Sequence, residues 1–319
     1  MNKEFGFQWH ITDRCAGGCR HCYQTAFDGA SELPVGALTR IADCVMTALA
    51  DTQVSVNVTG GEPLLYQCIN KNYGARVDGR INGGAFELMA HLSKFDNIDE
   101  LNIITGTYGL NQSVINNLKS IPRLTSVKVS LESHDPRIND GIRNHGHFNM
   151  VTRNIKALAD SGLPVVVMAT LSRHNYESVE GLCGLCADMG AAGVILERYV
   201  PLGRGTALAD NVLTSREWRD IAAAVIRVAN IDVSIDDLLP YRAFRIDMPH
   251  GTLGDDCEVS GAFCNLGPSS MALMPDGTVY PCRRVPTAIG KLPDDGMEAI
   301  LSRLDEHSST PQQCFRFDF

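Results

Sequence analysis

The chain has 319 residues, of which 44% are hydrophobic, and its formal net charge is −9. This length allows one large domain, or a large and a small one, with enough apolar content for a core that needs no disulfide bonds. The acidic balance and the lack of any run of Lys and Arg argue against a nucleic-acid substrate. No apolar stretch approaches the roughly 20 residues that span a bilayer, and the N-terminus does not resemble a secretory leader, so we expect a cytoplasmic protein without a membrane partner.

The first half of the chain alternates between strand and helix patterns. Phe5, Phe7, Trp9 and Ile11 follow the period of a strand, and residues 35–49 follow that of an amphipathic helix. Strands are then predicted at 54–58, 101–105, 126–131, 164–171 and 193–199, and helices at 85–95, 111–120, 148–160, 175–190 and 215–229. Six β/α units in series predict an α/β fold, a parallel sheet closed or partly closed into a barrel, over residues 1–230.

The pattern changes in residues 231–319. Gly and Pro become more frequent, and residues 271–274 and 278–280 flank Pro-Asp-Gly, which predicts a hairpin. A last helix is predicted at 296–304 from the shared apolar face of Met297, Ile300, Leu301 and Leu304. We therefore expect a small separate C-terminal module.

Three of the eleven cysteines lie together just after the first strand, at Cys15, Cys19 and Cys22. In a β/α barrel this is where active-site loops gather. Three thiolates can hold one cubane and leave one of its four irons open. The alternatives are a zinc knuckle that includes His21, or an electron-transfer cluster whose fourth cysteine lies elsewhere.

The spacing CX3CX2C resembles the signature of the radical S-adenosylmethionine (SAM) superfamily. The resemblance implies a partial TIM-like barrel and a [4Fe-4S] cluster that cleaves SAM reductively to a 5′-deoxyadenosyl radical, which abstracts a hydrogen atom. It also implies a reductant of the flavodoxin or ferredoxin type. His21 stands where the family usually has an aromatic residue, which affects adenine packing more than cluster ligation.

Two further segments resemble the superfamily's SAM-binding motifs. The "GGE" motif follows the second strand, as in the family, and Ser-Leu-Glu at the end of the fourth strand resembles the family's Ser-Leu-Asp ribose segment. An arginine thirteen residues later stands where related enzymes bind the SAM carboxylate, although it could also be a solvated charge. The cofactor-binding residues implied are Gly60, Gly61, Glu62, Ser130, Glu132 and Arg143.

A second set of cysteines lies in the C-terminal module. Cys264, Gly277 and Cys282 fit the CX9–15GX4C pattern of the twitch and SPASM modules that follow radical SAM barrels. Cys257 and Cys314 stand where the larger module supplies the other two ligands, so the resemblance implies a second, fully cysteine-ligated [4Fe-4S] cluster. A zinc ribbon is the alternative, but paired CX2C knuckles are missing.

The resemblance indicates the class of enzyme and leaves the substrate open. We favour oxidation or crosslinking of a ribosomally made peptide by hydrogen abstraction. Because only fourteen residues precede Cys15, we expect a peptide substrate to be recognised directly or through a separate leader-binding protein. The alternatives are radical chemistry on a small-molecule metabolite and a two-cluster electron carrier without enzyme activity. The pair Cys183 and Cys186 lies on an apolar helical stripe, so we expect it to be core packing.

Overall fold

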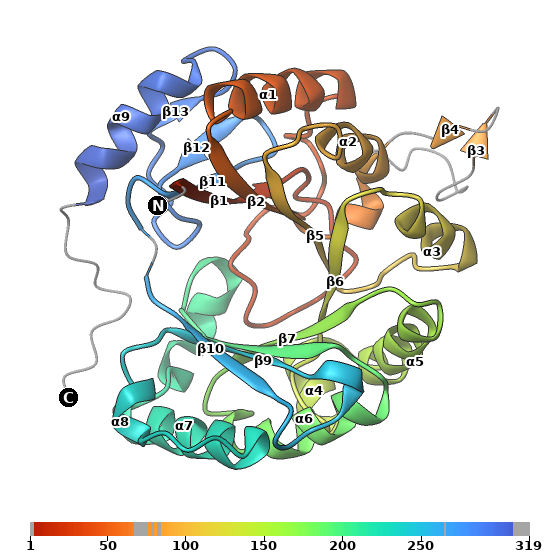
Figure 1. Cartoon of the computed structure of the whole chain (residues 1–319), viewed down its shortest axis with the longest axis vertical. Coiled ribbons are helices and arrows are strands. Elements are labelled where there is room, and N and C mark those ends of the chain that lie inside the picture. The colour runs from red at the N-terminus through yellow and green to blue at the C-terminus, as the bar shows by residue number, and fades with distance from the viewer. Residues whose placement is uncertain (1–2, 67–75, 78–79, 82–83, 265, 309–319) are drawn as a thin grey trace. The chain divides into compact units, whose positions relative to one another are not determined.

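A computed structural model describes residues 3–66, 76–77, 80–81, 84–264 and 266–308 (Figure 1). The chain divides into two compact units. The first comprises residues 1–16, 26–127 and 265–311, and the second comprises residues 17–25, 128–264 and 312–319. No helix in the described ranges is long and apolar enough to cross a membrane.

The first unit is built on six strands in the order β5-β2-β1-β11-β12-β13. β1 is parallel to β2 and β11, β2 is parallel to β5, and β11, β12 and β13 are antiparallel in succession. The strands are β1 (Lys3–His10), β2 (Thr52–Thr59), β5 (Ile98–Thr105), β11 (Ser270–Leu273), β12 (Thr278–Tyr280) and β13 (Gly290–Lys291). The helices are α1 (Val35–Ala48), α2 (Ala85–Leu92), α3 (Gln112–Lys119) and α9 (Met297–Ser308), and β3 (Arg76–Val77) pairs with β4 (Arg80–Ile81).

The predicted hairpin at Pro-Asp-Gly is confirmed as β11 and β12. Gly277 has φ +87°, and a Cβ at this position would lie 2.3 Å from the carbonyl oxygen of Leu292. Asp276 accepts hydrogen bonds from the backbone N–H and the hydroxyl of Thr278, at 3.0 and 2.8 Å. The turn thus requires glycine, and it fixes the register of the two strands.

The two faces of the first unit's sheet differ in chemistry. On one face, residues paired in register across β1, β2 and β5 are apolar and fully buried: Phe7, Val56 and Leu101. The next row along the same strands carries side-chain amides: Gln8, Asn57 and Asn102. Because side chains alternate along a strand, this row faces the opposite side from the apolar core. Gln8 and Asn57 are half-buried there.

In the second unit, β7 (Val165–Leu171) is parallel to β8 (Gly193–Arg198), and β9 (Ala243–Asp247) and β10 (Glu258–Ala262) continue antiparallel. β6 (Leu124–Ser130) begins in the first unit and ends in the second. The helices are α4 (Pro136–Ile142), α5 (His147–Asp160), α6 (Val179–Asp188), α7 (Ser215–Ala229) and α8 (Ile235–Leu238). α6 and α7 pack side by side along the strands of this unit (Figure 1).

The predicted succession of parallel strands and helices is confirmed, and the chain has a mixed α/β fold. Several features were not predicted, among them α4, β9 and β10. α4 precedes the predicted helix at 148–160 and begins at Pro136, with Asp135 as its N-cap. β9 and β10 lie where apolar periodicity fades, since strands of five residues leave little pattern in the sequence. The boundary predicted at residue 230 between a barrel and a C-terminal module stays a prediction.

Candidate functional site

The segment that leads into Cys15 is held against the glycines after β2. The N–H groups of Gly61 and Glu62 donate to the carbonyl oxygens of Thr12 and Arg14, both at 2.8 Å. A Cβ at Gly60 would lie 2.3 Å from the Thr12 oxygen, and one at Gly61 would lie 2.4 Å from the Arg14 oxygen. These positions admit only glycine, because a side chain would push the two backbones apart.

Side chains hold the same segment from its other side. The Asp13 carboxylate accepts hydrogen bonds from the Gly29 N–H at 2.6 Å and the Ser31 hydroxyl at 2.7 Å. Glu32 is hydrogen-bonded to the Thr12 hydroxyl and pairs with the Arg14 guanidinium at 3.3 Å. The loop after the cysteine motif is therefore fixed to the residues before it.

Glu62 is fully buried, and protein donors occupy its carboxylate. It accepts hydrogen bonds from the Thr105 hydroxyl at 2.6 Å and from the N–H groups of Gly106 at 2.8 Å, Leu64 at 3.2 Å and Tyr108 at 3.4 Å. Burial raises the pKa of Glu62 to about 7, although these donors oppose the rise. The side chain thus ties the glycine turn to the end of β5.

Residues 17–25, which include Cys19 and Cys22, belong to the second unit. The Arg20 N–H donates to the Ile142 carbonyl at 2.8 Å, and the Gly205 N–H donates to the Cys22 carbonyl at 2.9 Å. A Cβ at Gly203, which has φ +53°, would lie 2.2 Å from the Tyr23 oxygen. The segment is thus fixed to the end of α4 and to the 3₁₀ turns of Gly203–Asn211.

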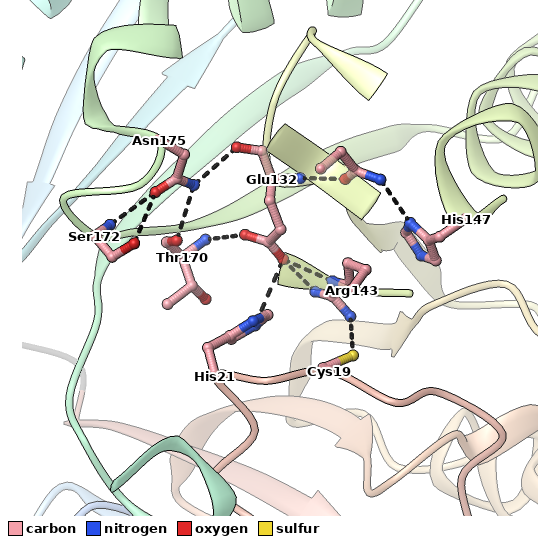
Figure 2. Close-up of polar contacts among 9 residues, drawn as sticks. Cys19, His21, Glu132, Arg143, His147, Thr170, Ser172 and Asn175 are labelled. Carbon is pink, nitrogen blue, oxygen red and sulfur yellow. Dashed lines mark hydrogen bonds and ion pairs between the residues drawn. The ribbon is translucent and has the colours of Figure 1, made fainter. Parts of the chain in front are cut away.

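Figure 2 shows a buried ion pair beside Cys19. Glu132, which has no exposed surface, pairs with the Arg143 guanidinium: Arg143 Nε donates to Oε1 at 2.8 Å, and Nη2 contacts the same oxygen. The Thr170 N–H donates to Glu132 Oε2 at 2.8 Å. Burial by itself would raise the pKa of Glu132, but the Arg143 charge and these donors hold it below its usual range. Arg143 Nη1 also lies 3.4 Å from Cys19 Sγ.

His21 lies next to this pair, with Nε2 3.6 Å from Glu132 Oε1 (Figure 2). Burial lowers the pKa of His21 to about 4, with Glu132 opposing and Arg143 reinforcing the shift, so the ring is neutral near pH 7. Nδ1 is buried without a hydrogen-bond partner. His21 therefore presents a neutral polar ring where the family usually has an aromatic residue.

The backbone of Glu132 is fixed by two asparagines that the sequence did not indicate. Its N–H donates to Asn139 Oδ1 at 3.1 Å, and its carbonyl accepts from Asn175 Nδ2 at 2.8 Å. Asn175 Oδ1 in turn accepts from the Ser172 N–H at 2.8 Å. A cluster of polar residues just after β7 was the available signal, because side chains at the carboxyl ends of parallel strands gather at one edge. Ser130 is the half-buried last residue of β6.

The structure places the C-terminal cysteines only in part. Cys257 is buried and Cys264 is exposed, both in the second unit, whereas Cys282 is half-buried in the first. Cys314 lies outside the described residues. Within the described ranges, no three His, Cys, Asp or Glu side chains are already gathered as a metal site. Both predicted ligand sets thus stay predictions from the spacing of the cysteines.

Cys183 and Cys186 on α6 have no exposed surface. Burial raises the pKa of Cys183 to about 12, with the nearby Cys257 adding to the rise, and burial also raises the pKa of Cys186 well above its usual value. Both thiols are therefore protonated near pH 7. This agrees with the prediction that they are core packing.

Comparison with known protein families gives one match. The model described as "Radical SAM superfamily" matches residues 9–186, more than half of the chain. The match covers the CX3CX2C motif, the glycine turn and the Glu132–Arg143 pair.

The similar proteins include two curated relatives. GTP 3′,8-cyclase of Petrotoga mobilis is 24% identical over 90% of this chain and 83% of its own length. The antilisterial bacteriocin subtilosin biosynthesis protein AlbA of Bacillus subtilis is 21% identical over 99% of this chain and 64% of its own. Among solved structures, Streptococcus suis SuiB bound to precursor peptide SuiA has a TM-score of 0.59 at 15% identity, over 89% of this chain and 60% of that one. At that identity the likeness shows the fold alone.

Proposed function

Because the chain belongs to the radical SAM superfamily, which implies a [4Fe-4S] cluster and SAM, we propose that Cys15, Cys19 and Cys22 ligate that cluster. The CX3CX2C spacing inside the matched region is the observation that carries this proposal. When bound, the cluster and SAM supply a 5′-deoxyadenosyl radical that abstracts a hydrogen atom from the substrate. The cysteine segments are held by the glycine turn in one unit and by the end of α4 in the other.

The residues present fit these groups. All three cysteines are free thiols, the ligand type that iron–sulfur clusters require. Gly60 and Gly61 hold the backbone before Cys15 at a distance that no side chain would allow. Arg143, 12% exposed, contacts Glu132 and lies beside Cys19, and a guanidinium is the type of group that binds a carboxylate such as that of SAM.

The proposed substrate is a ribosomally made peptide, which the enzyme oxidises or crosslinks. Two of the similar proteins support this choice by their names: AlbA takes part in bacteriocin biosynthesis, and SuiB was solved with a precursor peptide. The half-buried amides of Gln8 and Asn57, which lie in register on β1 and β2, support it from the structure, whereas Asn102 beside them is buried and bonded to Glu100 and Ser126. Side-chain amides donate and accept at once, as peptide bonds do.

A second, auxiliary [4Fe-4S] cluster is proposed in the C-terminal module, residues 231–319, with Cys257, Cys264, Cys282 and Cys314 as ligands. Four thiolates leave no iron open to substrate, so its role would be electron transfer. Removing a hydrogen atom and then one electron from the substrate amounts to a net oxidation. This supports oxidation or crosslinking over epimerisation, which removes no net electron.

Radical chemistry on a small molecule is the second candidate. The observation that favours it is GTP 3′,8-cyclase, of whose length the match covers 83%, a larger share than of AlbA or SuiB. Glu100 pairs in register with Ser55, two residues before the Asn57–Asn102 pair on the same two strands. Its negative charge counts against binding of a triphosphate beside these amides, because like charges repel. A two-cluster electron carrier is the non-enzyme alternative. For either enzyme we propose a cytoplasmic location and a flavodoxin- or ferredoxin-type reductant.

The test is anaerobic reconstitution followed by reaction with SAM and a low-potential reductant. We expect about eight irons per chain and release of 5′-deoxyadenosine. Replacing Cys15, Cys19 and Cys22 by Ala should leave about four irons and abolish SAM cleavage. Persistent 5′-deoxyadenosine in this variant would reject the cysteine assignment, and iron without any SAM cleavage in the unaltered protein would favour the electron carrier.

The substrate is tested by co-expression with any short peptide encoded beside the gene. Mass spectrometry should find a loss of about two hydrogens per modification, because the net reaction is an oxidation. Incorporation of one solvent deuteron at carbon without that loss would instead indicate epimerisation. An unmodified peptide, together with turnover of a nucleotide, would support the second candidate.

A further inference from the structure

All polar groups of Glu132 are already engaged by protein. The carboxylate contacts Arg143 through Oε1 and the Thr170 N–H through Oε2, while the backbone N–H and carbonyl are held by Asn139 and Asn175 (Figure 2). The side chain has no exposed surface. A ribose hydroxyl could therefore reach this carboxylate only if the residues that cover it moved aside.

Arg143 is the partner whose position Glu132 determines. Two nitrogens of the planar guanidinium, Nε and Nη2, meet the same carboxylate oxygen, which fixes the plane of the group. With the plane fixed, the third nitrogen, Nη1, lies 3.4 Å from Cys19 Sγ. The arrangement runs from the buried carboxylate through the arginine to a cysteine of the CX3CX2C motif.

We propose that Glu132 is a positioning residue: it holds Arg143 beside Cys19 and so serves the amino-acid end of SAM, not the ribose. This inference rests on the proposed function. It assigns Glu132 a different role from the ribose contact implied by the resemblance to the family's Ser-Leu-Asp segment. The extra methylene of Glu relative to Asp gives the carboxylate the reach to meet both Arg143 and the Thr170 N–H.

The test compares two fragments of SAM binding to the reconstituted cluster protein. Methionine carries the amino and carboxylate groups, and 5′-methylthioadenosine carries the adenine and ribose. In Glu132→Gln, which keeps the shape and removes the charge, methionine affinity should fall at least tenfold, because the charged pair that orients Arg143 is lost. Affinity for 5′-methylthioadenosine should stay within about twofold. Anaerobic titration calorimetry measures both.

Two further variants make the result decisive. Glu132→Asp keeps the charge and withdraws it by one methylene, and it should also lower the affinity for methionine but not that for 5′-methylthioadenosine. This second variant keeps the test valid if Glu132→Gln fails to fold. Asp160→Asn, at an exposed i,i+4 pair with Lys156 on α5, is the matched control and should change neither affinity. Thermal unfolding checks that each variant is folded.

Two outcomes overturn the inference: unchanged methionine affinity in both Glu132 variants, or a loss of 5′-methylthioadenosine affinity as large as that for methionine. The second outcome would indicate that Glu132 contacts the ribose of SAM. Failure of the proposed function gives a different result, because the unaltered protein would then hold no cluster or bind neither fragment.

Discussion

Gly61→Ala tests how the segment before Cys15 is held. The added Cβ would lie 2.4 Å from the Arg14 carbonyl oxygen and 2.6 Å from that of Asp13. Real Cβ atoms essentially never come within 3.0 Å of a heavy atom outside their own residue and its two chain neighbours, so the two backbones must separate by about half an ångström or more. Both neighbours are backbone atoms, so no side-chain rotation can relieve the overlap.

The expected magnitude follows from this overlap. Overpacking at a buried contact costs about 1–3 kcal/mol of unfolding free energy, which lowers Tm by several degrees. The hydrogen bonds from Gly61 and Glu62 to Thr12 and Arg14 should also stretch from 2.8 Å. Since these residues lead directly into Cys15, the iron content after anaerobic reconstitution should fall as well.

Gly184→Ala is the matched control. Gly184 lies inside α6, and a Cβ there meets nothing within 4 Å. The same substitution should leave the iron content unchanged and keep or raise Tm, because alanine is favoured over glycine in a helix by about 1 kcal/mol. Thermal unfolding and iron analysis of both variants check the prediction. Equal Tm and equal iron in Gly61→Ala and Gly184→Ala would refute the reasoning.

Three other changes have expected outcomes. Arg143→Met leaves the Glu132 carboxylate buried without its counter-charge, so the free energy of unfolding measured in urea should fall by about 3–5 kcal/mol. Lys156→Met removes one partner of an exposed pair and should lower it by less than about 1 kcal/mol. Equal losses in the two variants would contradict the role of the buried pair. Glu62 has a folded pKa of about 7, raised from 4.5, so its contribution to stability is present below about pH 4.5 and is lost as pH rises through about 7. Between about pH 5.5 and 8 this loss is about 2 kcal/mol, and Glu62→Gln should flatten the pH profile of urea unfolding by that amount; an equally steep profile in the variant would place the titration elsewhere. Cys186→Ser buries a hydroxyl in an apolar stripe and should lower stability by about 1–3 kcal/mol at constant iron content, so a loss of iron would make it a ligand.

Features encoded within short windows could be predicted from the sequence. The strand and helix periods of residues 5–49, the hairpin at Gly277 and the apolar stripe with Cys183 and Cys186 each depend on neighbours a few residues apart. The spacing of Cys15, Cys19 and Cys22 is also local, and it sufficed to indicate the superfamily that the match over residues 9–186 then showed. The period of a helix or strand and the backbone conformation of a turn depend only on residues close together in the sequence.

Only the tertiary structure decided which of these residues meet. Glu62 belongs to a motif associated with SAM, yet its carboxylate is occupied by Thr105 and Gly106 at the end of β5, more than forty residues away. The neighbours of Glu132 in sequence predict a ribose ligand, which stays a prediction, whereas the contacts of its carboxylate with Arg143 and Thr170 are seen only in the structure. β9 has no readable period, because its five residues are placed by pairing with β8 and β10. A single sequence records the residue types but not their partners, since contacts between distant segments arise only when the chain folds and buries them together.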